Sequence, residues 1–302
     1  MHIVQFVHSW KEYSFPLAEQ DTYGRFCVPW NGGKHCRRLV KNFGDYVDGN
    51  RLKKSTLTFW TEWEAPTFAT DVRKWNGEAK FIHEVRYPTI TSGNINQHGV
   101  CSENRDCHGL TALLNTDPCV FGSSFKYSNC LQSQKYRHVF QNLEEGSMIL
   151  FVSHTSDQWY LDTVLVTHGN CVPYVTPKIS TIDCSQAYRD LTLNRLLSGE
   201  KHYFYRGVTY NSSSTMRYGV FSYVPAHIYS GNIDDCKRCR LDLQKINEDI
   251  GQNIFSAGIP QGYKPTESNA KLVRSVWQKI KAQVTDQGFV LGVHFDWPKL
   301  ED

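Results

Sequence analysis

Three short stretches in the N-terminal half of the chain group side chains that could do chemistry. The first is Trp30-Asn31-Gly32-Gly33-Lys34-His35-Cys36-Arg37-Arg38. It offers a ring for stacking, an amide that can read a base edge, a titratable imidazole and forked cations suited to phosphate. We therefore assign candidate roles within it: base binding to Trp30, catalysis to Asn31 and His35, and phosphate binding to Lys34, Arg37 and Arg38. The alternative is a turn followed by a solvated basic helix.

The second stretch is Phe59-Trp60-Thr61-Glu62-Trp63-Glu64-Ala65-Pro66. If it forms a strand, Trp60, Glu62 and Glu64 share one face. Two carboxylates on one face are costly to bury, so the face is either exposed to solvent or its acids have partners. Buried acids with a raised pKa are typical general acids and bases. Glu62 and Glu64 are therefore catalytic candidates, and Trp60 is a candidate base-binding residue.

The third stretch is Asn115-Thr116-Asp117-Pro118-Cys119-Val120-Phe121-Gly122, followed by Tyr127-Ser128-Asn129-Cys130. A polar turn after the apolar run 110–114 lies at the edge of a sheet, where ligands often bind. Asp117 could activate a water, Asn115 or Asn129 could orient it, and Phe121 or Tyr127 could stack on a base. The alternative is an Asx-type turn before a loop. We favour Asp117 over Glu62 and Glu64 as the catalytic acid, because Pro118 restrains its backbone.

The periodicity of the chain predicts the framework that must position these stretches. Strands are expected over residues 3–8, 55–60, 204–210, 220–224 and 289–295, with a hairpin over 148–153 and 160–166. Helices are expected from about Lys34, over 185–197, and after the capping run Thr266-Glu267-Ser268-Asn269. Residues 88–109 are rich in Gly, Asn, His and Cys and predict a long loop.

Size and composition are those of a globular protein. The chain has 302 residues, of which 40% are hydrophobic and 21% charged, so it can bury a substantial core. We expect a mixed α/β (α+β) fold: one large domain, 1–302, around a mixed β-sheet with flanking helices and a small β-barrel-like portion. A subdivision into a catalytic and base-binding part, 1–170, and a supporting part, 171–302, is also considered.

The formal charge of +3 is too small to imply a polyanionic partner by itself. The start of the chain lacks the basic and apolar regions of a signal peptide, and no stretch is apolar enough to cross a bilayer. The 10 cysteines are therefore interpreted as reduced thiols of a cytoplasmic protein.

Several signatures of cofactor and metal enzymes do not occur in the sequence. It has no phosphate-binding P-loop, no Gly-x-Gly-x-x-Gly fingerprint, no Gly-x-Ser-x-Gly elbow and no His-Glu-x-x-His helix. Cys236-x-x-Cys239 is half of a zinc site, and no second pair has matching spacing. We expect no cofactor and no bound metal.

The ordered motifs WNGGKHCRR, FWTEWEAP, NTDPCVFG, YSNC and FYRGVTY resemble an uncharacterised prokaryotic family. Its common form carries WN-x-G-x-H-x-RK-F, FWGEWEPPS, NTDPWVFG, YSNC and YRG elements, and the match spans nearly the whole chain. Thr61 and Cys119 replace a usual Gly and Trp, which could retune a pocket. The resemblance implies a setting in nucleotide modification and phage defence, including glycosylases that excise modified bases from viral DNA.

The leading expectation is a DNA glycosylase that removes a modified base, such as a hypermodified cytosine, from double-stranded phage DNA. Such an enzyme flips the nucleotide out and stabilises positive charge on the sugar with a carboxylate. The alternatives are a PUA-like or EVE-like reader, which binds a modified base without chemistry, and an enzyme acting on free nucleotides. The glycosylase expectation requires the three stretches to meet in one pocket.

Overall fold

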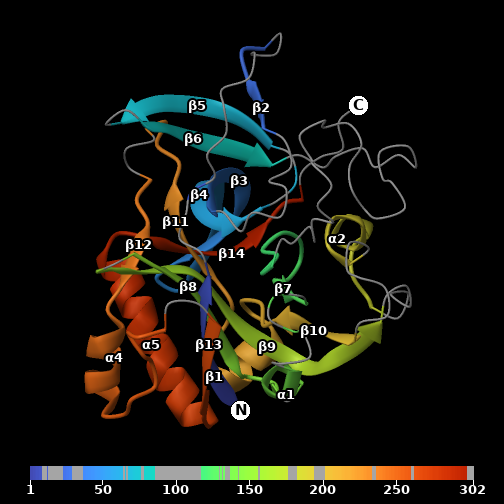
Figure 1. Cartoon of the computed structure of the whole chain (residues 1–302), viewed down its shortest axis with the longest axis vertical. Helices are drawn as coiled ribbons and strands as arrows, with labels where there is room; N and C mark the ends of the chain where they lie inside the picture. Colours follow the sequence, from blue (N-terminus) through green and yellow to red (C-terminus); the bar gives the residue numbers. More distant parts are fainter. Residues whose placement is uncertain are drawn as a thin grey trace.

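The computed structural model describes most of the chain outside several connecting segments. The described residues are 1–8, 12, 23–28, 37–63, 65, 67–75, 78–85, 117–128, 130, 132, 137–141, 143–155, 157–175, 182–193, 201–232, 236–259 and 262–297. They form two mixed β-sheets with short flanking helices, so the fold is mixed α/β as expected (Figure 1). No closed barrel is formed by these residues, which corrects the expected barrel-like portion. The division of the chain into domains stays a prediction.

The first sheet has the strand order β13–β1–β8–β9–β10–β7, and β12 pairs with β9 outside this path. Its strands are β1 (His2–His8), β7 (Lys126–Tyr127), β8 (Met148–His154), β9 (Trp159–Val175), β10 (Lys201–Gly207), β12 (Cys239–Leu241) and β13 (Gly262–Glu267). β1 runs parallel to β8, and His8 lies opposite Ser153. Successive residues of β1 are buried on both faces, which is why its sequence is a continuous apolar run.

The predicted hairpin over 148–153 and 160–166 is confirmed as β8 and β9, which pair antiparallel. The strand over 3–8 is confirmed as β1. The strand expected over 204–210 begins earlier, at Lys201, because β10 pairs with the long end of β9.

The second sheet has the order β14–β11–β4–β3–β6–β5–β2, and β14 also pairs with β3. Its strands are β2 (Phe26–Val28), β3 (Arg37–Asp48), β4 (Arg51–Glu62), β5 (Thr67–Trp75), β6 (Glu78–Val85), β11 (Val224–Ile228) and β14 (Val290–Phe295). In Figure 1 this sheet occupies the upper part of the view, with β2, β5 and β6 uppermost. The strands expected over 55–60 and 289–295 are confirmed, whereas the one expected over 220–224 begins only at Val224.

The helix expected from about Lys34 is wrong over its described part, because Arg37–Asp48 is strand β3. β3 pairs with β4 residue by residue, from Arg37 opposite Glu62 to Asp48 opposite Arg51. Gly49 makes the connecting turn with a φ of 61°, a left-handed conformation that favours glycine. A strand here buries Arg37 and Arg38 against acceptors, whereas the expected helix would have left them solvated.

The helices are α1 (Arg137–Phe140), α2 (Gln186–Leu191), α3 (Ser213–Tyr218), α4 (Leu243–Ile250) and α5 (Ala270–Asp286). The helix expected after residues 266–269 is confirmed as α5, whose N-cap Asn269 accepts a hydrogen bond from the Leu272 N–H. The helix expected over 185–197 is confirmed in shorter form as α2, with Ser185 as N-cap. α5 buries Val273, Val276, Trp277, Ile280 and Val284, the stripe that helical spacing predicts.

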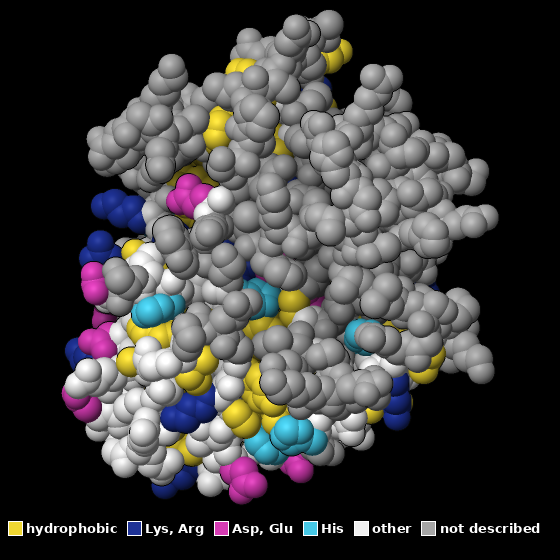
Figure 2. Space-filling view, in the orientation of Figure 1, with side chains coloured by type: hydrophobic (Ala, Val, Ile, Leu, Met, Phe, Trp, Pro, Cys, Tyr) yellow, Lys and Arg dark blue, Asp and Glu magenta, His cyan; other side chains and the backbone are white. Residues whose placement is uncertain are grey.

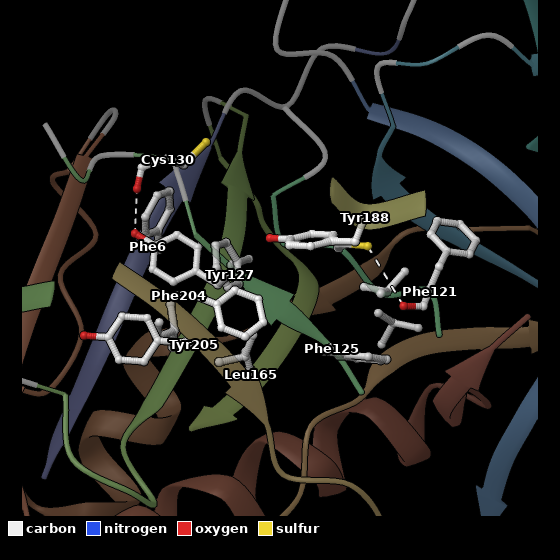
Figure 3. Close-up of a cluster of buried hydrophobic side chains, with 14 of the residues drawn as sticks. Phe6, Phe121, Phe125, Tyr127, Cys130, Leu165, Tyr188, Phe204 and Tyr205 are labelled. Carbon is white, nitrogen blue, oxygen red and sulfur yellow. Dashed lines mark hydrogen bonds between the residues drawn. The ribbon is translucent and has the colours of Figure 1, made fainter. Parts of the chain in front are cut away.

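Residues 117–128 connect the two sheets. Within this segment Lys126 and Tyr127 form β7, which pairs with β10 of the first sheet. The backbone N–H of Gly122 donates to the carbonyl of Phe295, in β14 of the second sheet. The aromatic side chains of the segment enter the shared core that Figure 3 shows.

Burial of His83 generates a prediction about acid stability. Its ring is buried in β6 with Nδ1 2.8 Å from Thr67 Oγ1, and burial, with a smaller contribution from Arg38, lowers its pKa well below the usual value. The unfolded chain therefore binds a proton below about pH 6.5 that the folded chain does not. The contribution of the neutral His83 ring to the free energy of unfolding is complete above that pH. It is lost as the pH falls, by up to about 1.4 kcal/mol per pH unit.

We expect His83→Gln to flatten the acid side of the stability profile, measured by urea unfolding at a series of pH values. His138→Gln, which changes an exposed histidine of α1, is the matched control and should leave the profile unchanged. Equal acid slopes in the wild type and His83→Gln would contradict this interpretation.

Candidate active site

A buried ion-pair network joins the ends of strands from both sheets. Arg37, the first residue of β3, donates from Nη1 to Glu62 Oε2 at 2.7 Å and from Nε to Asp162 Oδ2 at 3.1 Å. Glu62 is the last residue of β4, and Asp162 lies in β9 of the other sheet. The side chains of all three are at most 3% exposed. The guanidinium therefore bridges two buried carboxylates that belong to different sheets.

Arg238 extends this network from the connection before β12. Its Nη2 donates to Asp162 Oδ1 at 2.9 Å and to the hydroxyl of Ser153 in β8. Its guanidinium also lies 5.3 Å from the centre of the Trp60 ring and 4.9 Å from that of Tyr160. Such cation–π contacts favour a charged guanidinium beside aromatic faces.

His8 and Cys130 complete the cluster on the other side of Glu62. His8 ends β1, and its Nδ1 lies 2.8 Å from Glu62 Oε2. The candidate ligand atoms of His8, Glu62 and Cys130 all lie within 4.8 Å of one another. We call the set His8, Arg37, Glu62, Cys130, Asp162 and Arg238 the Glu62 cluster.

Charge is balanced within the Glu62 cluster. Burial by itself lowers the pKa of Arg37, but the nearby Asp162 and Glu62 carboxylates outweigh burial and raise that pKa. Arg37 is therefore charged at neutral pH, and its charge favours the ionised form of Glu62. With two guanidinium groups and two carboxylates, the cluster is neutral when the His8 imidazole is neutral.

The Glu62 cluster contains a buried donor, on Arg37, that has no acceptor among the described residues. Arg37 Nη2 is buried and makes no hydrogen bond there. A buried donor without a partner costs roughly 1–3 kcal/mol. A ligand oxygen placed at this nitrogen would recover that cost.

A divalent cation fits the cluster poorly, although His8, Glu62 and Cys130 are close enough to share one. Glu62 Oε2 already contacts both Arg37 Nη1 and His8 Nδ1, and the buried guanidinium repels a cation. In the Cys236-x-x-Cys239 motif, Cys236 Sγ lies 3.2 Å from Thr58 Oγ1. Burial raises the pKa of Cys239 well above the usual thiol value, which opposes metal ligation. The expectation of no bound metal stays a prediction.

Asp117 holds the segment that carries Cys130. Its carboxylate is fully buried and accepts hydrogen bonds from the backbone N–H of Ser128, at 3.0 and 3.2 Å to its two oxygens, and of Cys130, at 2.9 Å. These donors lie eleven and thirteen residues along the chain, whereas the donor of an Asx-type turn lies about two residues on, so these contacts are long-range and do not form that turn. These contacts leave the catalytic role expected for Asp117 untested.

The expected stacking rings are buried in the core. Phe121 and Tyr127 are 1% and 0% exposed. Phe121 packs on Trp63 at 4.9 Å, and the Tyr127 hydroxyl donates to the Cys130 carbonyl, as Figure 3 shows. Neither ring could contact a ligand without displacement of this core. Trp60 is only partly buried, so it is the accessible ring among the described base-binding candidates.

The structure brings together one described residue from each of the three sequence stretches: Arg37, Glu62 and Cys130. Arg38, also predicted to bind phosphate, is buried and donates to the Ala65 carbonyl and to Thr67 Oγ1. Seven predicted site residues lie outside the described residues, and their placement is not tested: Trp30, Asn31, Lys34, His35, Glu64, Asn115 and Asn129.

Sequence reasoning missed His8, Asp162 and Arg238. Asp162 had a signal, because it is a lone acid within the apolar strand β9 and needs a buried partner. His8 had a weaker one, as a polar residue that ends an apolar strand. Arg238, between Cys236 and Cys239, had none beyond its charge.

Comparison with protein-family models, with curated proteins and with solved structures found no match. Within the described part of the chain, no helix has the length and apolar character needed to cross a membrane.

The bridging position of Arg37 generates a second prediction. Arg37→Met removes the charge that both buried carboxylates face, and leaving a buried charge unpaired costs about 3–5 kcal/mol. We expect that loss of unfolding free energy in urea at neutral pH. Lys53→Met, which breaks the exposed pair with Asp48, is the control and should leave stability unchanged. Equal stability of Arg37→Met and the wild type would show that the bridge is dispensable.

Proposed function

We propose that the chain is a DNA glycosylase that hydrolyses the N-glycosidic bond of a modified base in double-stranded DNA. The observation that carries the proposal is the buried Glu62 carboxylate, held by Arg37 at 2.7 Å and contacted by His8 at 2.8 Å. A fixed, ionised carboxylate beside a titratable imidazole suits a reaction that develops positive charge on a sugar.

The position of the Glu62 cluster supports the same proposal. His8, Glu62 and Arg37 all stand at strand ends, where ligand sites of mixed sheets commonly lie. The partly exposed Trp60 beside the guanidinium of Arg238 supplies a flat surface for a base. The buried Nη2 of Arg37 supplies a donor for a base or sugar oxygen.

In the proposed mechanism the substrate nucleotide is extruded from the duplex into the site. The bond between C1′ and the base nitrogen breaks, and its electron pair leaves with the base. Glu62 stabilises the positive charge that develops on the sugar, because its orientation is fixed before the reaction. Water then adds to C1′, and its proton passes through His8 to the departing base.

The target and setting are part of the proposal and follow from the family resemblance of the motifs. The base is a modified cytosine of phage DNA, and the protein acts in the cytoplasm in antiviral defence. In Figure 2 the Lys and Arg side chains are interspersed with Asp and Glu over the lower part of the face shown, rather than gathered in one patch. DNA contact would therefore depend on a few well-placed cations rather than on a broad basic surface on this face.

The proposal predicts that Glu62→Gln lowers base release by roughly a hundredfold or more, the usual effect of losing one preorganised charge-stabilising group. DNA binding should persist, since the substitution preserves side-chain shape. Release is measured as abasic sites in modified and plain duplexes, with folding checked by urea unfolding.

Asp117→Asn is the matched comparison, because it changes a second buried carboxylate. We expect it to lower stability through the Ser128 and Cys130 hydrogen bonds, and to retain base release in the folded fraction. Loss of release in Asp117→Asn with normal release in Glu62→Gln would move the catalytic role to Asp117. Binding without release in the wild type would instead favour the reader, and indifference to DNA would favour an enzyme of free nucleotides.

A further inference from the structure

A small polar cavity of about 140 Å³ lies beside the 117–128 segment. It is formed where β7 and β10 meet the chain before α2, and its lining includes Lys126, Asp183, Cys184, Ser185, Arg206 and Trp297. No member of the Glu62 cluster contributes to it. A water occupies about 30 Å³ of liquid, so the cavity suits a group of a few heavy atoms rather than a nucleoside.

Two cations face each other across this cavity. The antiparallel pairing of β7 and β10 places Lys126 directly opposite Arg206. Like charges at facing strand positions repel, and Lys126 is buried. Among the described residues of the lining, the only carboxylate is that of Asp183, which pairs with Arg206 at 2.7 Å and has a side chain 94% exposed. The described lining therefore carries a net positive charge, with its one counter-charge at the solvent side.

Two described donors at the cavity have hydrogen-bonding capacity that their described partners do not use. The Lys126 ammonium donates to the carbonyls of Phe121, at 3.0 Å, and Ser124, at 2.6 Å, and has a third N–H. The Ser185 hydroxyl accepts from the Tyr188 N–H and keeps its own proton to donate. Burial raises the pKa of Cys184, so that thiol stays neutral and supplies no negative charge.

We propose that this cavity binds a phosphate group between Lys126 and Arg206. A tetrahedral oxyanion would offset the repulsion between the two cations and accept from the remaining donors. Burial lowers the pKa of Lys126, and a bound anion would oppose that shift. The phosphate is either a diester of the DNA backbone or a free phosphate, and the site does not depend on the proposed glycosylase activity.

Thermal unfolding in phosphate and in chloride at matched ionic strength tests the site. Phosphate should raise the Tm of the full chain beyond chloride, since a ligand that binds only the folded state stabilises it. Arg206→Gln should weaken phosphate binding by about tenfold or more, the scale of one charged hydrogen bond. Asp183→Asn should strengthen it, because it removes the competing carboxylate from Arg206.

Arg217→Gln, which removes an exposed arginine of α3, is the control and should respond to phosphate as the wild type does. Lys126→Met should abolish the rise in Tm with phosphate. If this variant fails to fold, the opposite effects of Arg206→Gln and Asp183→Asn on phosphate binding still test the proposal. A phosphate response that is absent in the wild type, or equal in the wild type and Arg206→Gln, would overturn the proposal.

The salt dependence of DNA binding identifies the source of the phosphate. If a backbone diester occupies the cavity, Arg206→Gln reduces the slope of log affinity against log salt by about one, and duplex DNA removes the effect of phosphate on Tm. An unchanged slope with a lost phosphate response assigns the cavity to free phosphate. Neither measurement requires base release, so a failed glycosylase assay leaves this test intact.

Discussion

The contact of one guanidinium with two carboxylates is the constraint on which the rest of the arrangement depends. Arg37 belongs to the second sheet and Asp162 to the first, so their pair fixes how the two sheets meet at these strand ends. Glu62 could not remain ionised in the same interior without that guanidinium, because an isolated buried charge costs far more than a paired one. The stability of the fold and the proposed reactivity would thus rely on the same charge balance.

The 117–128 segment positions residues at both the Glu62 cluster and the small polar cavity. At one end the Asp117 carboxylate holds the backbone of Ser128 and Cys130, which puts the Cys130 thiol beside Glu62. Near its other end, the ladder with β10 places Lys126 opposite Arg206. A segment with little regular structure is held firmly because its buried backbone groups find partners in both sheets.

What the sequence could predict depends on how local the determining contacts are. β1, the β8–β9 hairpin and α5 follow from apolar patterns within a few residues, and all were expected. The Arg-Arg-Leu-Val start of β3 predicts an amphipathic helix, but antiparallel pairing with β4 makes this segment a strand. Arg37 and Asp162 are 125 residues apart, so their contact has no local signature. The acid–Pro turn suggested chemistry at Asp117, but its distant backbone partners were not visible in the sequence.

The closed set of charges around Arg37 also bears on how such a chain can evolve. A single substitution at Arg37, Asp162 or Arg238 leaves a buried charge uncompensated, while a joint replacement by neutral side chains of similar volume need not destabilise the fold. Selection for stability alone would therefore allow these positions to change only together. Across homologues they would covary as a block, and a lineage that kept the fold while losing the whole block would have kept the scaffold and lost the proposed chemistry.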